Sequence, residues 1–262
     1  RLPTMRLALT NLHRPGSPAP TVVLSLGLGL TVLVTVALIE GNFARAVNDR
    51  IPDSAPTFFF IDIQPDQLDP FRQQVEAEEG VTDFRATPMM RGRIMQVNGV
   101  EARKAVVNPD EAWVLNGDRG VTYTAEPVNQ GETIAGDWWP SDYMANRDGP
   151  PLVSVEESIA EAFGIGPGDE ITVSILGRNV TAEIAHVREV NWGTVQMNFT
   201  LIYAPGLLEG APQTWLATLK APPAAEANIQ RSIPAQFPNI SLIRVADAID
   251  TVNTVLGNIA TA

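Results

Sequence analysis

An uncharged apolar run near the N-terminus constrains this chain more than any other feature. Residues 21–39 read TVVLSLGLGLTVLVTVALI and contain no charged side chain. As a helix rising about 1.5 Å per residue, the run is about 28 Å long, close to the thickness of about 30 Å of the bilayer hydrocarbon. We therefore predict a transmembrane helix over residues 21–39. A cleaved secretory signal ending near Ala44-Arg45-Ala46 is the alternative, although the apolar core of a signal, roughly 7 to 15 residues, is shorter than this run.

The charges on the two sides of the run predict its orientation. Arg1, Arg6 and Arg14 are the only charged residues of the first 20, so the N-terminus is expected in the cytoplasm and the residues from 41 onward outside it. Residues 2–12 place apolar side chains at helical spacing and predict an amphipathic segment at the cytoplasmic membrane face. The chain has no cysteine, so the outer domain must be held by packing alone. These features favour the bacterial inner membrane, with the main domain in the periplasm.

Composition and motifs exclude several classes of function. A formal net charge of -12 without a basic stripe argues against nucleic acid as a partner. Gly164-Ile165-Gly166-Pro167-Gly168 follows a predicted helix and precedes a predicted strand, which is the reverse of a phosphate-binding loop, and the chain contains no Gly-Lys-Ser/Thr. His13 and His186 have no neighbours at metal-ligand spacing, and His186 is expected to be a partly solvated strand residue. We therefore predict no catalytic, cofactor-binding or metal-binding residues, no cofactor, and no enzymatic activity.

Two strand-helix-strand patterns flank a long middle segment of the outer domain. The first has strands at 57–63 and 81–97 around a helix that begins at Pro65 and that Gly80 ends, followed by a turn at Asn98-Gly99 and a returning strand over 101–107. The second has strands at 213–219 and 239–245 around a helix at 224–237. Two such units form a split four-stranded sheet with both helices on one face, so the predicted fold class is α+β with a ferredoxin-like βαβ/βαβ sheet.

The middle segment is predicted to be an inserted, β-rich subdomain. Ser154 and Glu157 have the spacing of a capping box, which predicts the start of a helix that Gly164 ends. Strands over 170–176 and 179–190 follow. The complete predicted organisation is a cytoplasmic amphipathic segment (1–20), a transmembrane helix (21–39), a stalk (40–56), a ferredoxin-like, porter-type subdomain (57–107 and 211–245), an inserted β-rich subdomain (108–210) and a second stalk (246–262) that leads toward a further transmembrane helix.

Two apolar pairs are candidates for contact with cargo or a partner protein. Trp138 and Trp139 are adjacent indoles followed by a proline, and one ring is expected to pack on the subdomain core while the other covers a loop. Met89 and Met90 stand beside two arginines and are expected in the core and at a strand edge. Binding of an apolar surface is the functional interpretation of both pairs.

Several segments together resemble a known family. The residues LALTNLHRP before the apolar run, the block LVSVEESIAEAFGIGPGDEITVSILGRNVTAEIAHVREVNWGTVQMNFTLIYAPGLL at 152–208, and the order of the predicted domains resemble the permease subunits of ABC transporters of the FtsX/MacB/LolC type, most closely the YbbP-like branch. The most specific parts are 164–169 with the strands after them, and REVNW at 188–192. The resemblance covers essentially the whole chain.

The resemblance implies a non-catalytic membrane subunit. Its partner would be a separate cytoplasmic ABC ATPase, and it would transmit ATP-driven motion through the stalks to a MacB-like periplasmic domain that handles hydrophobic or lipid-linked cargo, with or without a periplasmic partner protein. The chain would then be one span and one outer domain of a longer protein. A single-span, membrane-anchored binding, adaptor or sensor module without an ATPase is the alternative, and a secreted hydrolase is a third.

Overall fold

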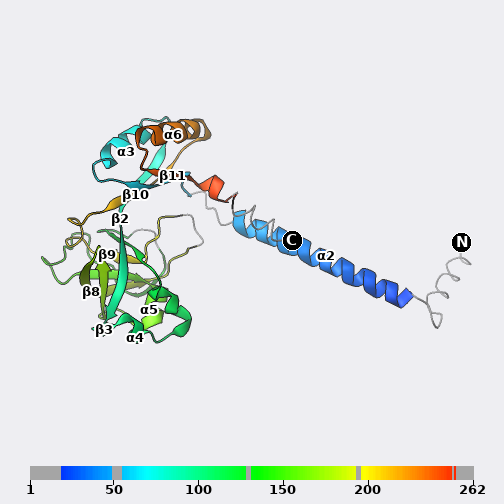
Figure 1. The fold of residues 1–262 in the computed structure, drawn as a ribbon, viewed down its shortest axis with the longest axis horizontal. Helices are drawn as coiled ribbons and strands as arrows, with labels where there is room; N and C mark the ends of the chain where they lie inside the picture. The colour runs from blue at the N-terminus through cyan, green and yellow to red at the C-terminus, as the bar shows by residue number, and fades with distance from the viewer. Residues whose placement is uncertain (1–18, 49–54, 128–130, 193–195, 250, 252–262) are drawn as a thin grey trace, which may run out of the picture. The chain divides into compact units, whose positions relative to one another are not determined.

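The computed structural model describes residues 19–48, 55–127, 131–192, 196–249 and 251. The chain divides into two compact units, residues 1–51 with 253–262 and residues 52–252 (Figure 1). The predicted amphipathic segment over 2–12 lies outside the described residues, and so does most of the second stalk. Each unit is described here by itself.

The described part of the first unit is a long apolar helix, α2, from Ala19 to Asn48. Its segment Thr21–Leu38 is long and apolar enough to cross a membrane, with a mean hydropathy of 2.3 and no part of it buried in the protein. Hydroxyl groups inside the span donate to backbone carbonyls one turn earlier, as Thr31 does to Gly27 at 2.7 Å, so these polar groups are paired without water. The helix continues past the apolar segment as far as Asn48, and the stalk over 40–56 stays a prediction.

The second unit combines helices with one connected mixed sheet of eleven strands. Its helices include α3 (Leu68–Glu76), α4 (Ala102–Ala105), the 3-10 helix η1 (Pro109–Leu115), α5 (Glu157–Phe163) and α6 (Pro223–Gln236). Its strands are β1 (Phe58–Ile63), β2 (Thr82–Val97), β3 (Val100–Glu101), β4 (Arg119–Tyr123), β5 (Thr133–Gly136), β6 (Leu152–Glu156), β7 (Glu170–Ile175), β8 (Arg178–Arg188), β9 (Leu201–Tyr203), β10 (Thr214–Lys220) and β11 (Ser241–Arg244).

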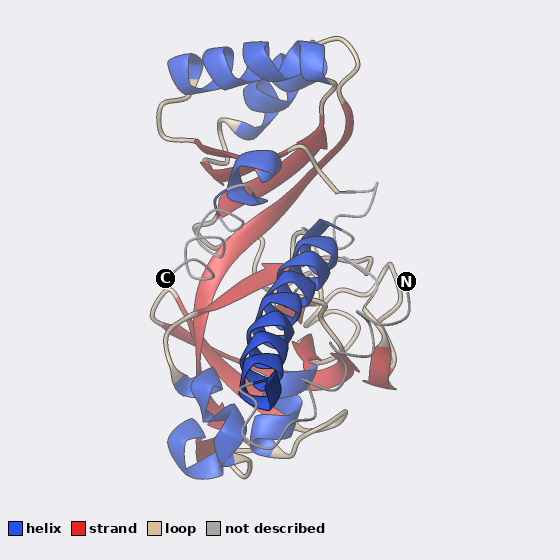
Figure 2. Cartoon of the chain, turned by 90° about the vertical axis from the view of Figure 1, so that its right-hand side faces the viewer, coloured by secondary structure: helices blue, strands red, loops and turns tan. Residues whose placement is uncertain are grey.

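One end of the sheet consists of four antiparallel strands in the order β11-β1-β10-β2. α3 connects β1 to β2 and α6 connects β10 to β11, so two strand-helix-strand segments interleave, as the sequence predicts. Both helices cover the same face (Figure 2). Phe71 of α3 and Ile229 of α6 are fully buried there against Phe58 and Phe60 of β1.

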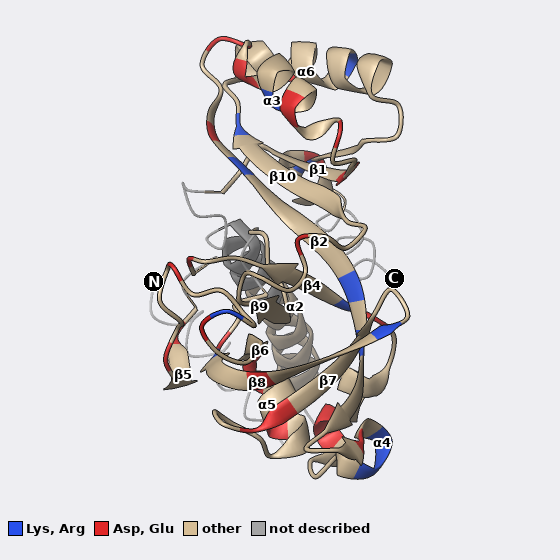
Figure 3. Ribbon diagram, turned by 90° about the vertical axis from the view of Figure 1, so that its left-hand side faces the viewer, with Lys and Arg blue, Asp and Glu red and all other residues tan. Residues whose placement is uncertain are grey.

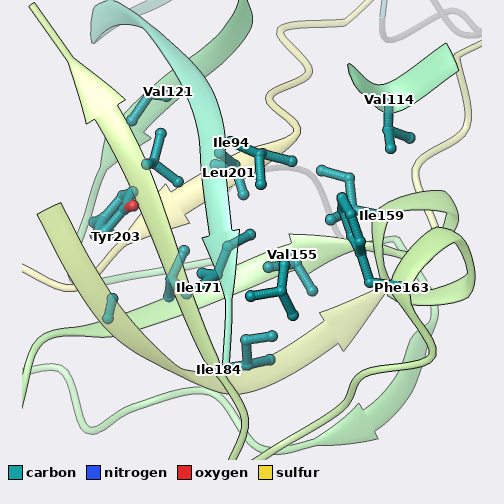
Figure 4. Close-up of a cluster of buried hydrophobic side chains, with 14 of the residues drawn as sticks. Ile94, Val114, Val121, Val155, Ile159, Phe163, Ile171, Ile184, Leu201 and Tyr203 are labelled. Atoms are coloured by element: carbon teal, nitrogen blue, oxygen red, sulfur yellow. The ribbon is translucent and has the colours of Figure 1, made fainter. Parts of the chain in front are cut away.

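The other end of the sheet closes on itself. β2, β4, β9, β6, β8 and β7 pair in that order, and β7 pairs again with β2, which makes a barrel of six strands. Alternate side chains of these strands point inward, and Figure 4 shows Ile171, Ile184 and Leu201 directed toward one another, with Ile159 of α5 at one side. The sixteen-residue strand β2 belongs to both the barrel and the four-stranded sheet. The predicted boundaries at 107/108 and 210/211 stay predictions.

The predicted returning strand over 101–107 is wrong beyond its first residue. The turn at Asn98-Gly99 forms, and β3 pairs Glu101 with Gln96. However, β4 pairs with β2 at Met90–Gly92 on the same edge, so a longer β3 would collide with it. The chain instead turns into α4, and Ala102 enters the barrel core.

The predicted capping box is also wrong. Ser154 lies inside β6, and α5 begins at Glu157 with no side-chain cap at its N-terminus. A Ser-x-x-Glu pattern in a fully buried strand has the same spacing as a cap, so the pattern alone does not separate the two cases. Gly164 ends α5 as predicted, in the left-handed conformation.

Candidate functional site

The first candidate site is the place where the chain enters and leaves the second unit. β1 begins and β11 ends at the same point of the sheet, where Phe58 pairs with Arg244. Directly beyond this pair, the Val245 N–H donates to the Thr57 carbonyl at 3.0 Å. The Thr57 hydroxyl is fixed in turn, because it donates to the Ala221 carbonyl at 3.2 Å and accepts from the Ala221 N–H at 3.0 Å. The two connections of this unit therefore meet at one hydrogen-bonded corner.

The C-terminal connection leaves this corner without a linker. β11 ends at Arg244, and residues 245–249 are already helical. The Arg244 Nε lies 3.5 Å from a carboxylate oxygen of Glu226 in α6 and 3.5 Å from one of Asp247 in the new helix. At about a third exposure, such pairs contribute at most about 1 kcal/mol. Their position is more informative than their strength, since Arg244 contacts the domain and the departing helix at once.

The second candidate site contains three of the four predicted contact residues. Trp138, Trp139 and Met89 belong to one apolar cluster, which we call the joint. It joins the loop after β5 and the chain around β9 to the uncovered face of the four-stranded sheet. Its members are Trp138, Trp139, Tyr143, Leu152, Ala185, Met197, Phe199, Ile202 and Ala204 on the barrel side, and Phe59, Met89 and Leu216 on the sheet side.

The two indoles of the joint stack on each other and are both anchored. Their ring centroids are 4.1 Å apart at an angle of 31°. Trp138 Nε1 donates to the Ala125 carbonyl at 2.9 Å, and Trp139 Nε1 donates to the Thr124 carbonyl at 3.0 Å. Trp139 is buried and Trp138 is half-buried. Met90 points to the opposite side of β2 from Met89 and lies in the barrel core.

A buried polar network lies directly beside the joint. His186 of β8 is only 6% exposed, so its predicted partial solvation is wrong. Its Nδ1 lies 2.9 Å from the Ser154 hydroxyl and its Nε2 lies 3.1 Å from the Thr133 hydroxyl. The ring also meets Trp138 edge-on, with 5.6 Å between centroids. Sequence reasoning missed this network because Ser154 was assigned to a helix cap.

Arg188 completes the network from the same strand. It is 4% exposed, and it donates to the Ser154 hydroxyl at 3.3 Å and to the Phe199 carbonyl. Burial lowers the pKa of Arg188 to about 10, opposed by the negative charge of Glu156, so the guanidinium stays protonated at neutral pH. Burial, and next to it the positive charge of Arg188, lowers the pKa of His186, while Asp137 acts in the opposite direction. His186 is therefore neutral at pH 7.

The geometry of this network does not fit nucleophilic catalysis. Ser154 is fully buried, and the second nitrogen of His186 faces a hydroxyl where a catalytic triad would have a carboxylate. Within the described ranges, no group of three or more His, Asp or Glu side chains is arranged to hold a metal ion. Figure 3 shows acidic and basic residues interspersed along the ribbon of the second unit, without a continuous run of basic residues on its described elements.

Comparison with known proteins gives one curated relative. The uncharacterized ABC transporter permease YbbP of Escherichia coli (strain K12) is 25% identical over 241 residues, which cover 92% of this chain and 28% of the relative. This chain is a distant homologue of an ABC transporter permease. The resemblance seen in residues 152–208 is thereby confirmed. This chain spans little more than a quarter of the length of the relative that it matches.

Other comparisons add little to this homology. No family model matches this chain. A crystal structure described as a domain of a permease protein from Porphyromonas gingivalis superposes with a TM-score of 0.41 at 12% identity, covering 74% of this chain and 92% of that one. The homology and the exposed apolar helix together indicate a chain anchored in a membrane.

Proposed function

We propose that this chain is part of a non-catalytic permease subunit of the FtsX/MacB/LolC type, which couples ATP hydrolysis by a separate cytoplasmic ATPase to work on hydrophobic or lipid-linked cargo in the periplasm. The N-terminus lies in the cytoplasm, α2 crosses the inner membrane, and residues 52–252 form the periplasmic domain. The coupling is mechanical. The helix that precedes the domain in the sequence and the helix that follows it act as levers.

The corner at Thr57 and Val245 is the observation that carries this proposal. The first and last strands of the domain meet at one hydrogen-bonded point, so forces applied through its two ends would move it as a unit, whereas forces applied at distant points would strain it. A helix is stiff and can transmit a displacement from the membrane to the domain, whereas a Gly/Ser linker is a flexible coil and would not transmit it. The direct transition from β11 into helix at residue 245 leaves no such linker on the C-terminal side.

The domain that receives this motion has a ferredoxin-like module at the levers. The strand order β11-β1-β10-β2, with α3 and α6 on one face, supports this assignment. The barrel is joined to the module through β2 and the joint, so displacement of the module carries the barrel with it.

Cargo or partner contact is assigned to the joint. Trp138 and Met89 are partly exposed and provide the accessible apolar surface, while Trp139 and Met90 are buried behind them. Contact with Trp139 therefore requires the joint to open. Crosslinking from a photoreactive residue introduced at Met89 tests this assignment, and the same residue at Val107, which is 65% exposed and outside the joint, is the control.

The lever proposal is tested in the full-length permease reconstituted with its ATPase. A Gly-Gly-Ser-Gly insertion after Ala248 would interrupt the C-terminal lever, and the same insertion after Gly210, in a surface loop with open space around it, is the control. We expect the first insertion to abolish the transport phenotype while ATP turnover continues and the outer domain stays folded. The insertion after Gly210 should leave both transport and ATP turnover intact. If transport and turnover survive the insertion after Ala248 unchanged, this helix is not a lever.

A further inference from the structure

The neighbours of His186 tie one titratable ring to the position of the joint. β5 pairs with β8 on one side only, and Gly136 pairs directly with His186. Immediately after β5, the Asp137 N–H donates to the Ala185 carbonyl at 3.2 Å, and Trp138 then meets the His186 ring. A Cβ on Gly136 would lie 2.1 Å from the Ala185 carbonyl oxygen, so glycine is required for this close approach.

The hydrogen bonds around the ring fit its neutral form. A neutral imidazole has one N–H donor and one acceptor, and the hydroxyls of Ser154 and Thr133 can each play either role. Protonation makes both ring nitrogens donors. The Ser154 oxygen, which already accepts from Arg188, must then accept from a second cation, and the Ser154 hydroxyl proton cannot be donated to the protonated ring.

The charged groups that face the ring come from three elements. Arg188, on β8 itself, is the cation bonded to the same Ser154 hydroxyl. Glu156 on β6 pairs in register with Arg188, and Asp137 follows β5. Asp137 favours the protonated ring, but burial and Arg188 outweigh it. Two cations joined by one hydroxyl in a buried site are costly unless one of them moves into water.

We propose that His186 is an acid-sensitive latch, which holds β5 and Trp138 on β8 while its ring is neutral and releases them when the ring is protonated. Release of Trp138 separates it from Trp139 and opens the joint between the barrel and the four-stranded sheet. A permease domain in a compartment open to the external medium would thus lose this connection in acid. The latch depends on the fold of the second unit alone, so it stands or falls independently of the ATPase and of any cargo.

The direction of the pH effect follows from linkage. The pKa of His186 in the closed form is lower than its value of about 6.5 in a solvated, open form, so the open form binds more protons. The closed form is fully favoured above pH 6.5. As the pH falls from 6.5 toward the lower pKa, the ratio of open to closed forms rises by up to about tenfold per pH unit.

The stacked indoles provide a direct spectroscopic readout. Two indoles 4.1 Å apart give an exciton-coupled circular dichroism signal, and Trp139→Phe identifies the part that belongs to this pair. In the full chain in detergent, we expect the couplet to persist at pH 7.5 and to disappear reversibly in acid, with a midpoint below 6.5. In His186→Gln, which keeps a donor and an acceptor but does not titrate, the couplet should persist through the same range. A couplet that survives at pH 4.5 in the unaltered chain, or one that disappears equally in His186→Gln, would overturn the latch.

A second measurement keeps the test decisive if His186→Gln does not fold. His13→Gln removes the other histidine, so one histidine ring remains in the NMR spectrum. The pH midpoint of that ring should coincide with the midpoint of the couplet. Midpoints that differ by more than one pH unit would assign the loss of the couplet to other groups and refute the role of His186.

Discussion

Gly92 lies at a crowded position of the barrel wall. It pairs with Arg119 on one edge of β2 and with Ile175 on the other, and it faces the interior. A Cβ at this position would lie 2.7 Å from Val173 Cγ1 and 2.8 Å from Val121 Cγ2. Both neighbours are fully buried branched side chains, so neither can move aside at low cost.

We expect Gly92→Ala to destabilise the second unit by about 1 to 3 kcal/mol, as overpacked cores generally are. Gly166→Ala is the matched control, because Gly166 has open space around it and should change stability by less than about 0.5 kcal/mol. Urea unfolding of the full chain in detergent, followed by circular dichroism, measures both. Equal stability of the two variants would show that the barrel wall yields more easily than its packing indicates.

Individual residues also mark the limit of what the sequence could predict. Gly164 at a helix end and Asn98-Gly99 at a hairpin are local signals, and the structure has both. Ser154 and His186 are brought together by the parallel pairing of β6 with β8, between segments some thirty residues apart. No local pattern encodes such a contact, so the polar network became visible only with the strand register.

At the scale of elements, the β2–β3 and β7–β8 hairpins of the second unit differ in their turn residues. The β2–β3 turn has Asn98 and Gly99 at positive φ, which is the preferred pair for this geometry. The β7–β8 turn has Leu176 at φ 50° and Gly177 at φ 81°. A leucine in the left-handed region is strained, and this one is 56% exposed, so burial does not compensate the strain.

Leu176→Asn should therefore stabilise the second unit by about 1 kcal/mol, because asparagine tolerates the left-handed conformation. The reciprocal change, Asn98→Leu, should destabilise it by more than that. It introduces the same strain and also removes the side-chain bonds of Asn98 to Asp169 at 2.9 Å and to the Glu170 N–H at 2.8 Å. Thermal unfolding of both variants tests the pair, and a loss of stability in Leu176→Asn would contradict the argument.

Helices and strands could be predicted from the sequence where their pattern is local, but the pairing of distant strands in the barrel could not. The positions of β1, α3, β2, β10 and α6 follow from apolar periodicity with its turn residues, and the split order of four strands follows from the two repeated units. Closure of the barrel depends on β7 meeting the far half of β2. The local sequence pattern also favoured a returning strand over 101–107. The sequence did not reveal that this strand would compete with β4 for one edge of β2, because that competition is a long-range effect.

At the scale of the whole second unit, the joint determines whether the barrel and the four-stranded sheet behave as one body. They share β2, and the joint is a further apolar connection between them. Trp139 carries the largest buried side chain of the joint and is only 4% exposed. Without it, the two ends of the unit would be held together mainly by one strand.

We expect Trp139→Ala to cost about 3 to 5 kcal/mol and to split unfolding into two transitions, one for each end of the sheet. Trp192→Ala is the control, since Trp192 is 54% exposed and outside the joint. Calorimetry of both variants, compared with the unaltered chain, measures the effect. A single transition in Trp139→Ala, at unchanged temperature, would mean that the joint contributes nothing to cooperativity.

The predicted membrane topology can be measured directly because the chain has no native cysteine. Single cysteines are introduced at Ser17 and at Asp118, whose side chain is 43% exposed, and intact cells with a permeabilised outer membrane receive an impermeant maleimide. Labelling at Asp118 alone is expected for a cytoplasmic N-terminus. Labelling at Ser17 in intact cells would reverse the orientation.

The sharing of β2 between two substructures also dictates an order of assembly during synthesis. All strands of the barrel have left the ribosome once residue 203 has emerged, whereas β1 waits for β10 and β11, at 214–220 and 241–244. The barrel can therefore form first. Until the last strands arrive, the first half of β2 and the aromatic strand β1 remain unpaired, and such edges associate readily with other chains. The nascent protein is most vulnerable to aggregation in that interval.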